Sequence, residues 1–183
     1  SELDAAHLLD TDAEFLLKAR RLFARLQLQA ALRFPDSRDW QWELHTSAEP
    51  EESAYAMAGG KLLLSLEQMR SWNLSEAELA MVMAHEMAHV VLAHHEAEYT
   101  FVLQHFPSWQ QHSFAELEHA IDHDADLIQA LAPLGKEQEL QADEVGWDLA
   151  RKAGYTPTSL LGFFKKLVKQ AVYQNFEIAS HPA

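Results

Sequence analysis

The residues best placed to do chemistry in this sequence are two histidines and a glutamate in the run His85-Glu86-Met87-Ala88-His89. Residues four apart on an α-helix differ by about 40° around its axis, so the two histidines would project from one face. Both imidazoles could then bind one metal ion, with Glu86 beside the open coordination position. The spacing therefore predicts a hydrolytic zinc site in which Glu86 acts as the general base.

A simpler interpretation of these residues is a solvated helix surface. In a chain with 11 histidines among 183 residues, the pattern would arise by chance in roughly one such sequence in twenty. However, residues 79–84 and 90–93 are apolar on almost every side, which predicts a buried helix. Buried polar side chains need partners. The flanking sequence therefore favours the metal site.

The surrounding sequence predicts a mainly helical α+β fold with a small β-sheet, in one domain over residues 1–183. Capping boxes are predicted at residues 11–14 and 75–78. Helices are expected over 11–32, 75–98, 136–153 and 156–173, and strands over 40–44 and 61–66. Short helices are expected between residues 100 and 135, where Pro107 and Pro133 would interrupt them.

Composition excludes several classes of function. The formal net charge of −14 argues against a nucleic-acid partner, because phosphate binding needs a basic face. The absence of cysteine excludes disulfides, thiolate metal sites and cysteine nucleophiles. No apolar run approaches the roughly 18 residues of a membrane span. The sequence thus predicts no membrane-spanning segment and no nucleic-acid binding.

A third metal ligand is needed, and one class of zinc peptidase takes it from a histidine six residues after the second. His95 occupies that position. That class needs a glycine to turn the chain, where this sequence has Leu92, and a methionine further along, whereas the last methionine here is Met87. We therefore expect the helix to continue past Leu92 and to carry His95 away from the metal.

Alternatively, a second helix could supply a glutamate ligand, with an aspartate four residues later to orient a ligand histidine. Three pairs have this spacing: Glu118/Asp122, Glu139/Asp143 and Glu144/Asp148. Spacing alone does not choose among them.

A resemblance to a known family selects one of these three pairs. Residues 84–94 resemble the zinc helix of the M48 metallopeptidases, the group of the HtpX, Oma1-like and CAAX prenyl proteases. Residues 139–146 and 153–157 resemble that family's second motif, and residues 53–60 its preceding strand entrance, with Ser53 and Ala58 departing from the usual residues. The resemblance is to the branch without membrane spans. It implies that Glu139 is the third ligand and Asp143 the residue that orients a ligand, within a zincin-like (gluzincin) fold.

Residues 179–182 also resemble a Ser-His-Pro element of the family, which normally continues to an arginine. The chain stops before one, so we expect it to be truncated at its C-terminus. His181 would then be a fourth zinc ligand or an oxyanion donor, unless it is only a tail residue. Tyr155 is a second candidate donor.

The resemblance implies a zinc endopeptidase that binds one Zn²⁺ ion and cleaves protein substrates, such as unfolded or misassembled envelope proteins, through a zinc-activated water. Its implied location is the bacterial periplasm or cell envelope, reached by a signal peptide that this chain does not contain. Substrate would add as a strand along residues 60–66. The alternative is a latent or chaperone-like zinc module that binds unfolded proteins without efficient cleavage.

Overall fold

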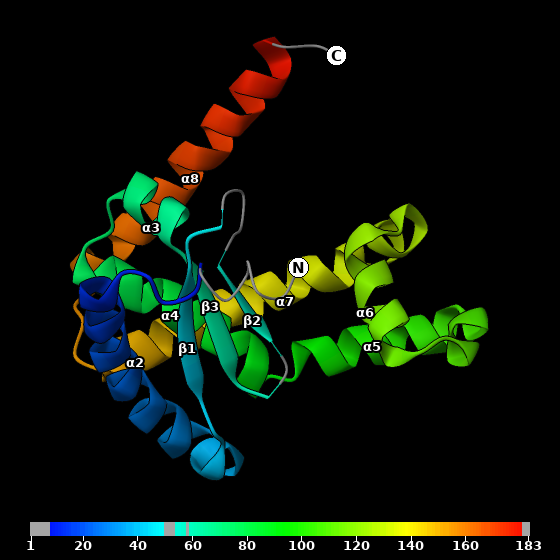
Figure 1. Ribbon diagram of the computed structural model, residues 1–183, viewed down its shortest axis with the longest axis horizontal. Coiled ribbons are helices and arrows are strands. Elements are labelled where there is room, and N and C mark those ends of the chain that lie inside the picture. The colour runs from blue at the N-terminus through cyan, green and yellow to red at the C-terminus, as the bar shows by residue number, and fades with distance from the viewer. Residues whose placement is uncertain (1–7, 50–53, 58, 181–183) are drawn as a thin grey trace.

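The computed structural model describes residues 8–49, 54–57 and 59–180, the last eleven as backbone only (Figure 1). Its helices and strands confirm a mainly helical chain with a small sheet. In chain order they are α2 (Ala13–Arg33), η1 (Pro35–Asp39), β1 (Glu43–Ser47), β2 (Tyr55–Met57), β3 (Lys61–Ser65), α3 (Leu66–Trp72), α4 (Glu76–Val91), α5 (His94–His105), η2 (Pro107–Gln111), α6 (Phe114–His123), α7 (Ala125–Lys152) and α8 (Pro157–Ser180).

The three described strands form one sheet in the order β1-β3-β2. β1 and β3 are parallel and β2 is antiparallel to β3. The first strand begins at Glu43, later than expected, because Trp40 and Trp42 pack on each other rather than extending the strand. Both edges of β3 are paired, so the prediction that substrate adds along residues 60–66 is wrong. The edge strand that contacts α4 is β2.

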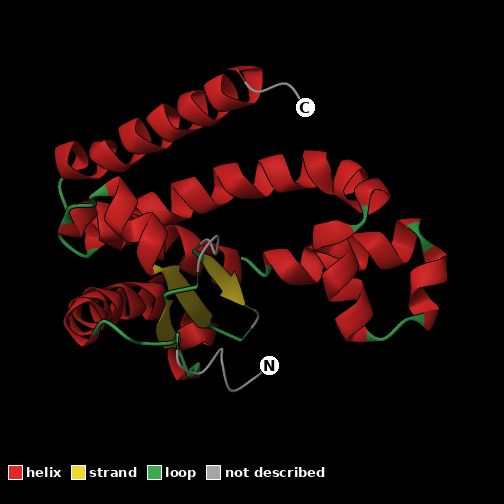
Figure 2. Cartoon of the chain, turned by 45° about the horizontal axis from the view of Figure 1, so that its top comes forward, coloured by secondary structure: helices red, strands yellow, loops and turns green. Residues whose placement is uncertain are grey.

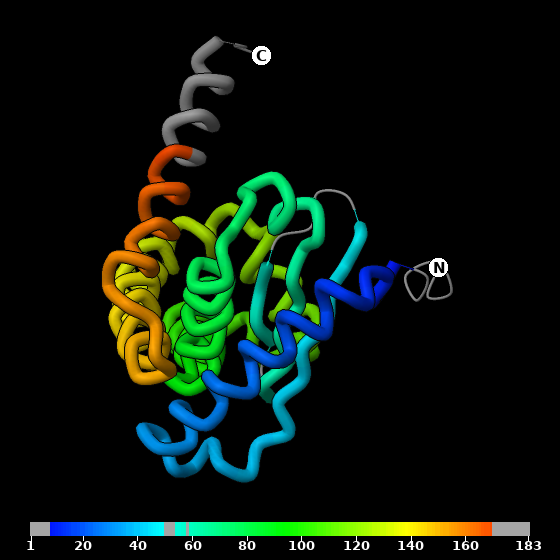
Figure 3. The backbone as a smooth tube through the Cα atoms, turned by 90° about the vertical axis from the view of Figure 1, so that its left-hand side faces the viewer, coloured from blue at the N-terminus to red at the C-terminus, as the bar shows by residue number. Residues whose placement is uncertain are grey.

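Helix α4 is the centre of the core. The predicted capping box is present: the Ser75 hydroxyl accepts a hydrogen bond from the Glu78 backbone, and the Glu78 carboxylate accepts one from Ser75. By contrast, α2 is capped by Asp12 and not by the predicted box at residues 11–14. α4 contacts the sheet as well as α7 and α8, and Figure 3 shows it between them. Most of its side chains are buried, namely residues 77–84, 87, 88 and 90.

The expected helix over residues 75–98 is wrong at its C-terminal part, because α4 ends at Val91. Ala93 has a left-handed backbone (φ 55°), and α5 begins at His94. Such a conformation costs a non-glycine residue about 1–2 kcal/mol. Leu92, despite its helix propensity, packs against the core, and His94 is buried. Tertiary packing therefore overrides the local preference and turns the chain.

Residues 94–123, which we call the helical arm, extend away from the sheet (Figure 2). The arm and the start of α7 share a separate small core. The expected short helices are present, but α7 begins at Ala125 and Pro133 does not interrupt it. Pro133 and Gln129, whose carbonyl loses a helical partner, are both exposed, so water can bind that carbonyl. The buried members of the small core are Val102, Leu117, Ala120, Leu127 and Leu131.

Helices α4 and α7 approach each other at Gly146. A Cβ atom at this position would lie 2.9 Å from the backbone nitrogen of His85 and 3.0 Å from its Cα atom. No side chain fits there without moving one of the two backbones. Gly146 lies about two helical turns after Glu139, so this contact sets the distance between the two predicted halves of the metal site.

We expect Gly146→Ala to lower the free energy of unfolding by about 1–3 kcal/mol, because the added methyl group overpacks a backbone contact. The matched control is Gly135→Ala in the same helix, where an added Cβ would meet no atom within 4 Å. Its helix propensity should raise stability by up to about 1 kcal/mol. Urea unfolding of both variants tests this, and equal effects would contradict the close contact.

Candidate metal centre

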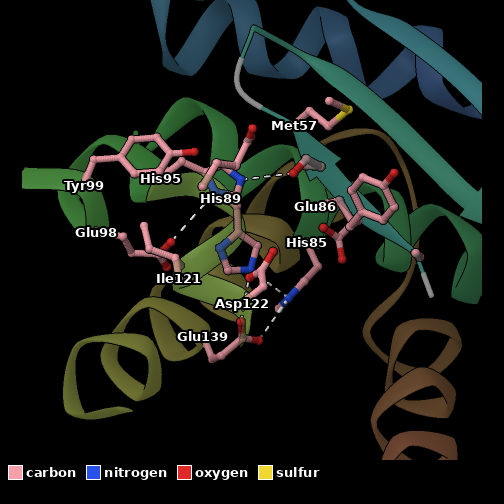
Figure 4. Close-up of a pocket in the computed structure, with 14 residues that line it drawn as sticks. Met57, His85, Glu86, His89, His95, Glu98, Tyr99, Ile121, Asp122 and Glu139 are labelled. Atoms are coloured by element: carbon pink, nitrogen blue, oxygen red, sulfur yellow. Dashed lines mark hydrogen bonds and ion pairs between the residues drawn. The ribbon is translucent and has the colours of Figure 1, made fainter. Parts of the chain in front are cut away.

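The structure brings together the two histidines of α4 and the glutamate of α7 that the sequence pointed to. The Nε2 atoms of His85 and His89 lie 3.1 Å apart. The Glu139 carboxylate reaches both, at 3.2 Å from His85 Nε2 and 3.3 Å from His89 Nε2. Figure 4 shows the three side chains converging, and their ligand atoms all lie within 4.8 Å of one another. This is the one group in the described part of the chain that could hold a metal ion.

The hydrogen bonds around His85 show that these residues fit a cation. Its Nδ1 atom lies 2.9 Å from a carboxylate oxygen of Asp143. A carboxylate accepts, so Nδ1 donates, and the lone pair of Nε2 is left facing Glu139 and His89. Two imidazole lone pairs and a carboxylate thus converge on one point, an arrangement that repels itself unless a cation lies between them.

Without a metal, a proton takes this role. Burial is the strongest influence on His85 and lowers its pKa, but the hydrogen bonds to Asp143 and Glu139 outweigh it and raise the pKa to about 10. The hydrogen bond from His85, and after it the neighbouring His89, in turn hold the pKa of Glu139 well below its usual range. In the metal-free protein His85 is therefore protonated at neutral pH, and a metal must displace that proton.

Glu86 lies beside these ligands with its carboxylate in the same cleft. Burial raises its pKa, and the neighbouring charges of His85 and His89 oppose that shift. The backbone of Ala56 in β2 also opposes the rise in the pKa of this carboxylate. A half-buried carboxylate with a raised pKa beside the ligands has the properties of a general base.

The ligands open into a cleft of about 750 Å³ between β2 and the helical arm. His95 lies in its wall and its Nε2 donates to the Ala56 carbonyl at 3.0 Å. His95 is not in the metal group, although the reason differs from the one expected: the chain does turn after Leu92, and it carries His95 toward β2. The arm adds acidic and aromatic side chains to the wall, including Glu98, Tyr99, Glu118 and Asp122.

Glu118 and Asp122 line the cleft but are not part of the metal group, and the other described candidates lie outside the cleft. Asp148 is paired with Arg33 and Lys152, and the Tyr155 hydroxyl accepts a hydrogen bond from Arg25. Tyr155 does not line the cleft, which removes it as an oxyanion donor. His181 lies outside the described residues, so its role stays a prediction.

Two residues near the ligands were not predicted from the sequence, His94 and Gln141. His94 is buried and its Nδ1 lies 2.8 Å from His89 Nδ1. Its position five residues after His89 was visible in the sequence, but on a continuous helix it would have pointed elsewhere. Only the turn at Ala93 makes the contact.

Comparisons with known proteins agree with this geometry. Residues 17–183 match the model of peptidase family M48. The chain is 29% identical over 132 residues to the mitochondrial metalloendopeptidase OMA1 of Schizosaccharomyces pombe, covering 70% of this chain and 38% of that protein. It is 27% identical over 139 residues to the beta-barrel assembly-enhancing protease of Escherichia coli O157:H7, covering 68% and 28%. The chain thus spans well under half the length of these relatives.

We expect Glu139→Ala to weaken zinc binding by more than about 100-fold, beyond the loss typical of an outer partner, because it removes a group that contacts both histidines. Glu118→Ala is the matched control, since Glu118 lines the same cleft without contacting them. Metal content after dialysis, together with competition titration, measures both. Loss of zinc in the Glu118 variant alone would move the site to the arm.

Zinc affinity should also rise with pH between about pH 6 and pH 8. The raised pKa of His85 means that the metal-free state holds a proton which the metal-bound state lacks, so lower proton concentration favours binding. Calorimetry in two buffers of different ionisation enthalpy should detect release of about one proton near pH 7. Affinity independent of pH would contradict the assigned protonation.

Proposed function

The chain belongs to peptidase family M48, and we propose that it is a zinc-dependent endopeptidase that hydrolyses protein substrates. The observation that carries this proposal is the convergence of His85, His89 and Glu139 beside Glu86 in an open cleft. The family implies hydrolysis of peptide bonds. The metal, the residue roles and the substrates are our proposal for this chain.

In this proposal His85, His89 and Glu139 hold one zinc ion, and Asp143 orients His85 through its Nδ1 atom. Two imidazole nitrogens and one carboxylate suit zinc and leave a fourth position open. When bound, the ion supplies a Lewis acid that polarises a peptide carbonyl and makes water more acidic. A zincin-like fold and a single domain over residues 1–183 belong to the same proposal.

Glu86 carries the proton transfers. Its carboxylate takes a proton from the attacking water and then delivers it to the leaving amine. The pKa raised by burial suits both steps, because a base whose pKa lies closer to the working pH can also act as an acid. Glu86 beside the ligands also favours hydrolysis over a chaperone-like binding module, which would not need a base there.

Substrate would bind as an extended strand along β2. This edge strand lines the cleft, and the carbonyl of Ala56 faces away from β3. His95 donates a hydrogen bond to this carbonyl, so a pairing peptide would take the place of His95 there. A peptide that pairs with this edge would form mainly backbone hydrogen bonds, which accept many sequences. Such recognition requires an extended chain and therefore favours unfolded segments as substrates.

We further propose that the substrates are unfolded or misassembled envelope proteins and that the protein works in the bacterial periplasm or cell envelope. The support is the similarity to a protease named for enhancing beta-barrel assembly. No helix among the described residues is long and apolar enough to cross a membrane.

We expect Glu86→Gln to lower the rate of casein cleavage by about 10²–10⁴-fold, the contribution typical of a general base, while zinc content stays unchanged. Glu144→Gln is the control, since Glu144 is an exposed acid of α7 that lies outside the cleft. A chelator should abolish wild-type cleavage and added zinc should restore it. Full activity in Glu86→Gln would exclude the proposed mechanism.

A further inference from the structure

The two ligand histidines have different outer partners. His85 donates from Nδ1 to the carboxylate of Asp143, whereas Nδ1 of His89 faces Nδ1 of His94 at 2.8 Å. An imidazole nitrogen donates only when it carries a proton and accepts only when it does not. One of these two Nδ1 atoms must therefore be protonated and the other not, and the choice determines which nitrogen of His89 carries its proton.

The far side of His94 decides the direction. Its Nε2 lies 3.0 Å from the side-chain oxygen of Gln141, and an amide oxygen can only accept. The amide nitrogen of Gln141 donates in turn to the Glu137 carboxylate at 3.3 Å, which sets the orientation of the amide. His94 thus donates from Nε2 and, as a neutral imidazole, accepts at Nδ1. His89 must then donate from Nδ1, and its Nε2 presents a free lone pair toward His85 and Glu139.

We propose that His94 is a positioning residue, the middle member of a hydrogen-bond chain Glu137–Gln141–His94–His89 that holds His89 in its metal-binding tautomer. The inference rests on the proposed zinc centre and assigns to His94 and Gln141 a role toward it. A reversed chain would put a proton on His89 Nε2, where the metal must bind.

The backbone around His94 supports this role. The Gln138 side chain donates to the His94 carbonyl at 3.0 Å, and both residues are buried. The left-handed Ala93 directs the chain back toward α7 immediately before His94. The left-handed backbone and the burial of an imidazole both cost free energy. Together they place Nδ1 of His94 against Nδ1 of His89.

The test compares substitutions of His94 that keep either its bulk or its acceptor. His94→Leu fills the site without an acceptor and should weaken zinc binding by about 10–100-fold, the loss typical of an outer partner. His94→Asn places an amide oxygen near the position of Nδ1 and should bind zinc within a few-fold of the wild type. Affinities come from competition with a chromophoric chelator, and circular dichroism verifies folding. Equal affinity of His94→Leu and wild type, or equal loss in both variants, would overturn the proposal.

Ring-nitrogen NMR gives a readout that a purely structural role would not move. In the zinc-loaded wild type, His94 should be the neutral tautomer with its proton on Nε2. Gln141→Leu, at an exposed position of α7, should let the other tautomer appear and weaken zinc binding by up to about 10-fold. A wild-type His94 with its proton on Nδ1 would exclude the chain, even if His94→Leu failed to fold.

The control for removing any histidine is His119→Leu, on the exposed side of α6. Its zinc affinity should equal that of the wild type, and a loss matching that of His94→Leu would overturn a specific role for His94. The proposed zinc centre and the proposed positioning role of His94 can fail separately. A wild-type chain that binds no zinc would refute the metal centre itself, whereas a chain that binds zinc and cleaves casein but ignores His94→Leu would refute only the positioning role.

Discussion

Three electron-pair donors, His85, His89 and Glu139, are held so that their lone pairs face one point, and much of the structure serves to keep them there. Such an arrangement repels itself unless a positive charge lies between the donors. The contact at Gly146 holds α7, which carries Glu139, close against α4, because no Cβ atom separates the two backbones. The repulsion is balanced by a proton on His85 in the metal-free protein and, in our proposal, by zinc.

The buried helix and the polar site depend on each other. α4 is surrounded by the sheet, α7 and α8, so that its imidazoles have little access to water. Each ring therefore needs a protein partner at the nitrogen that does not face the centre. Asp143 is the hydrogen-bond partner of His85 Nδ1, and His94 is the partner of His89 Nδ1. One partner is an anion and the other is neutral, which limits the negative charge buried around the site.

The turn after α4 links this chemistry to the cleft. A continuous helix would have carried residues 92–98 along the axis of α4, whereas the left-handed Ala93 ends that helix and turns the chain into α5. His94 then reaches His89, and His95 reaches the edge of β2. The same turn starts the helical arm, which forms the wall opposite the strand. Leu92 gave no local sign of this turn, because its propensity favours helix and only packing against the core opposes it.

The paired histidines of α4, Glu86 beside them and a mainly helical chain with a small sheet could all be predicted from the sequence, because helical periodicity and capping are local properties. The sequence also offered Glu139 with Asp143 as one of three Glu/Asp pairs with the same spacing. A family resemblance was needed to choose this pair. The edge strand, the path of the chain after Val91 and the contacts of His94 and Gln141 could not be predicted in this way and became visible only in the folded chain. These depend on contacts between residues far apart in the chain, or on a backbone conformation that packing imposes against local preference.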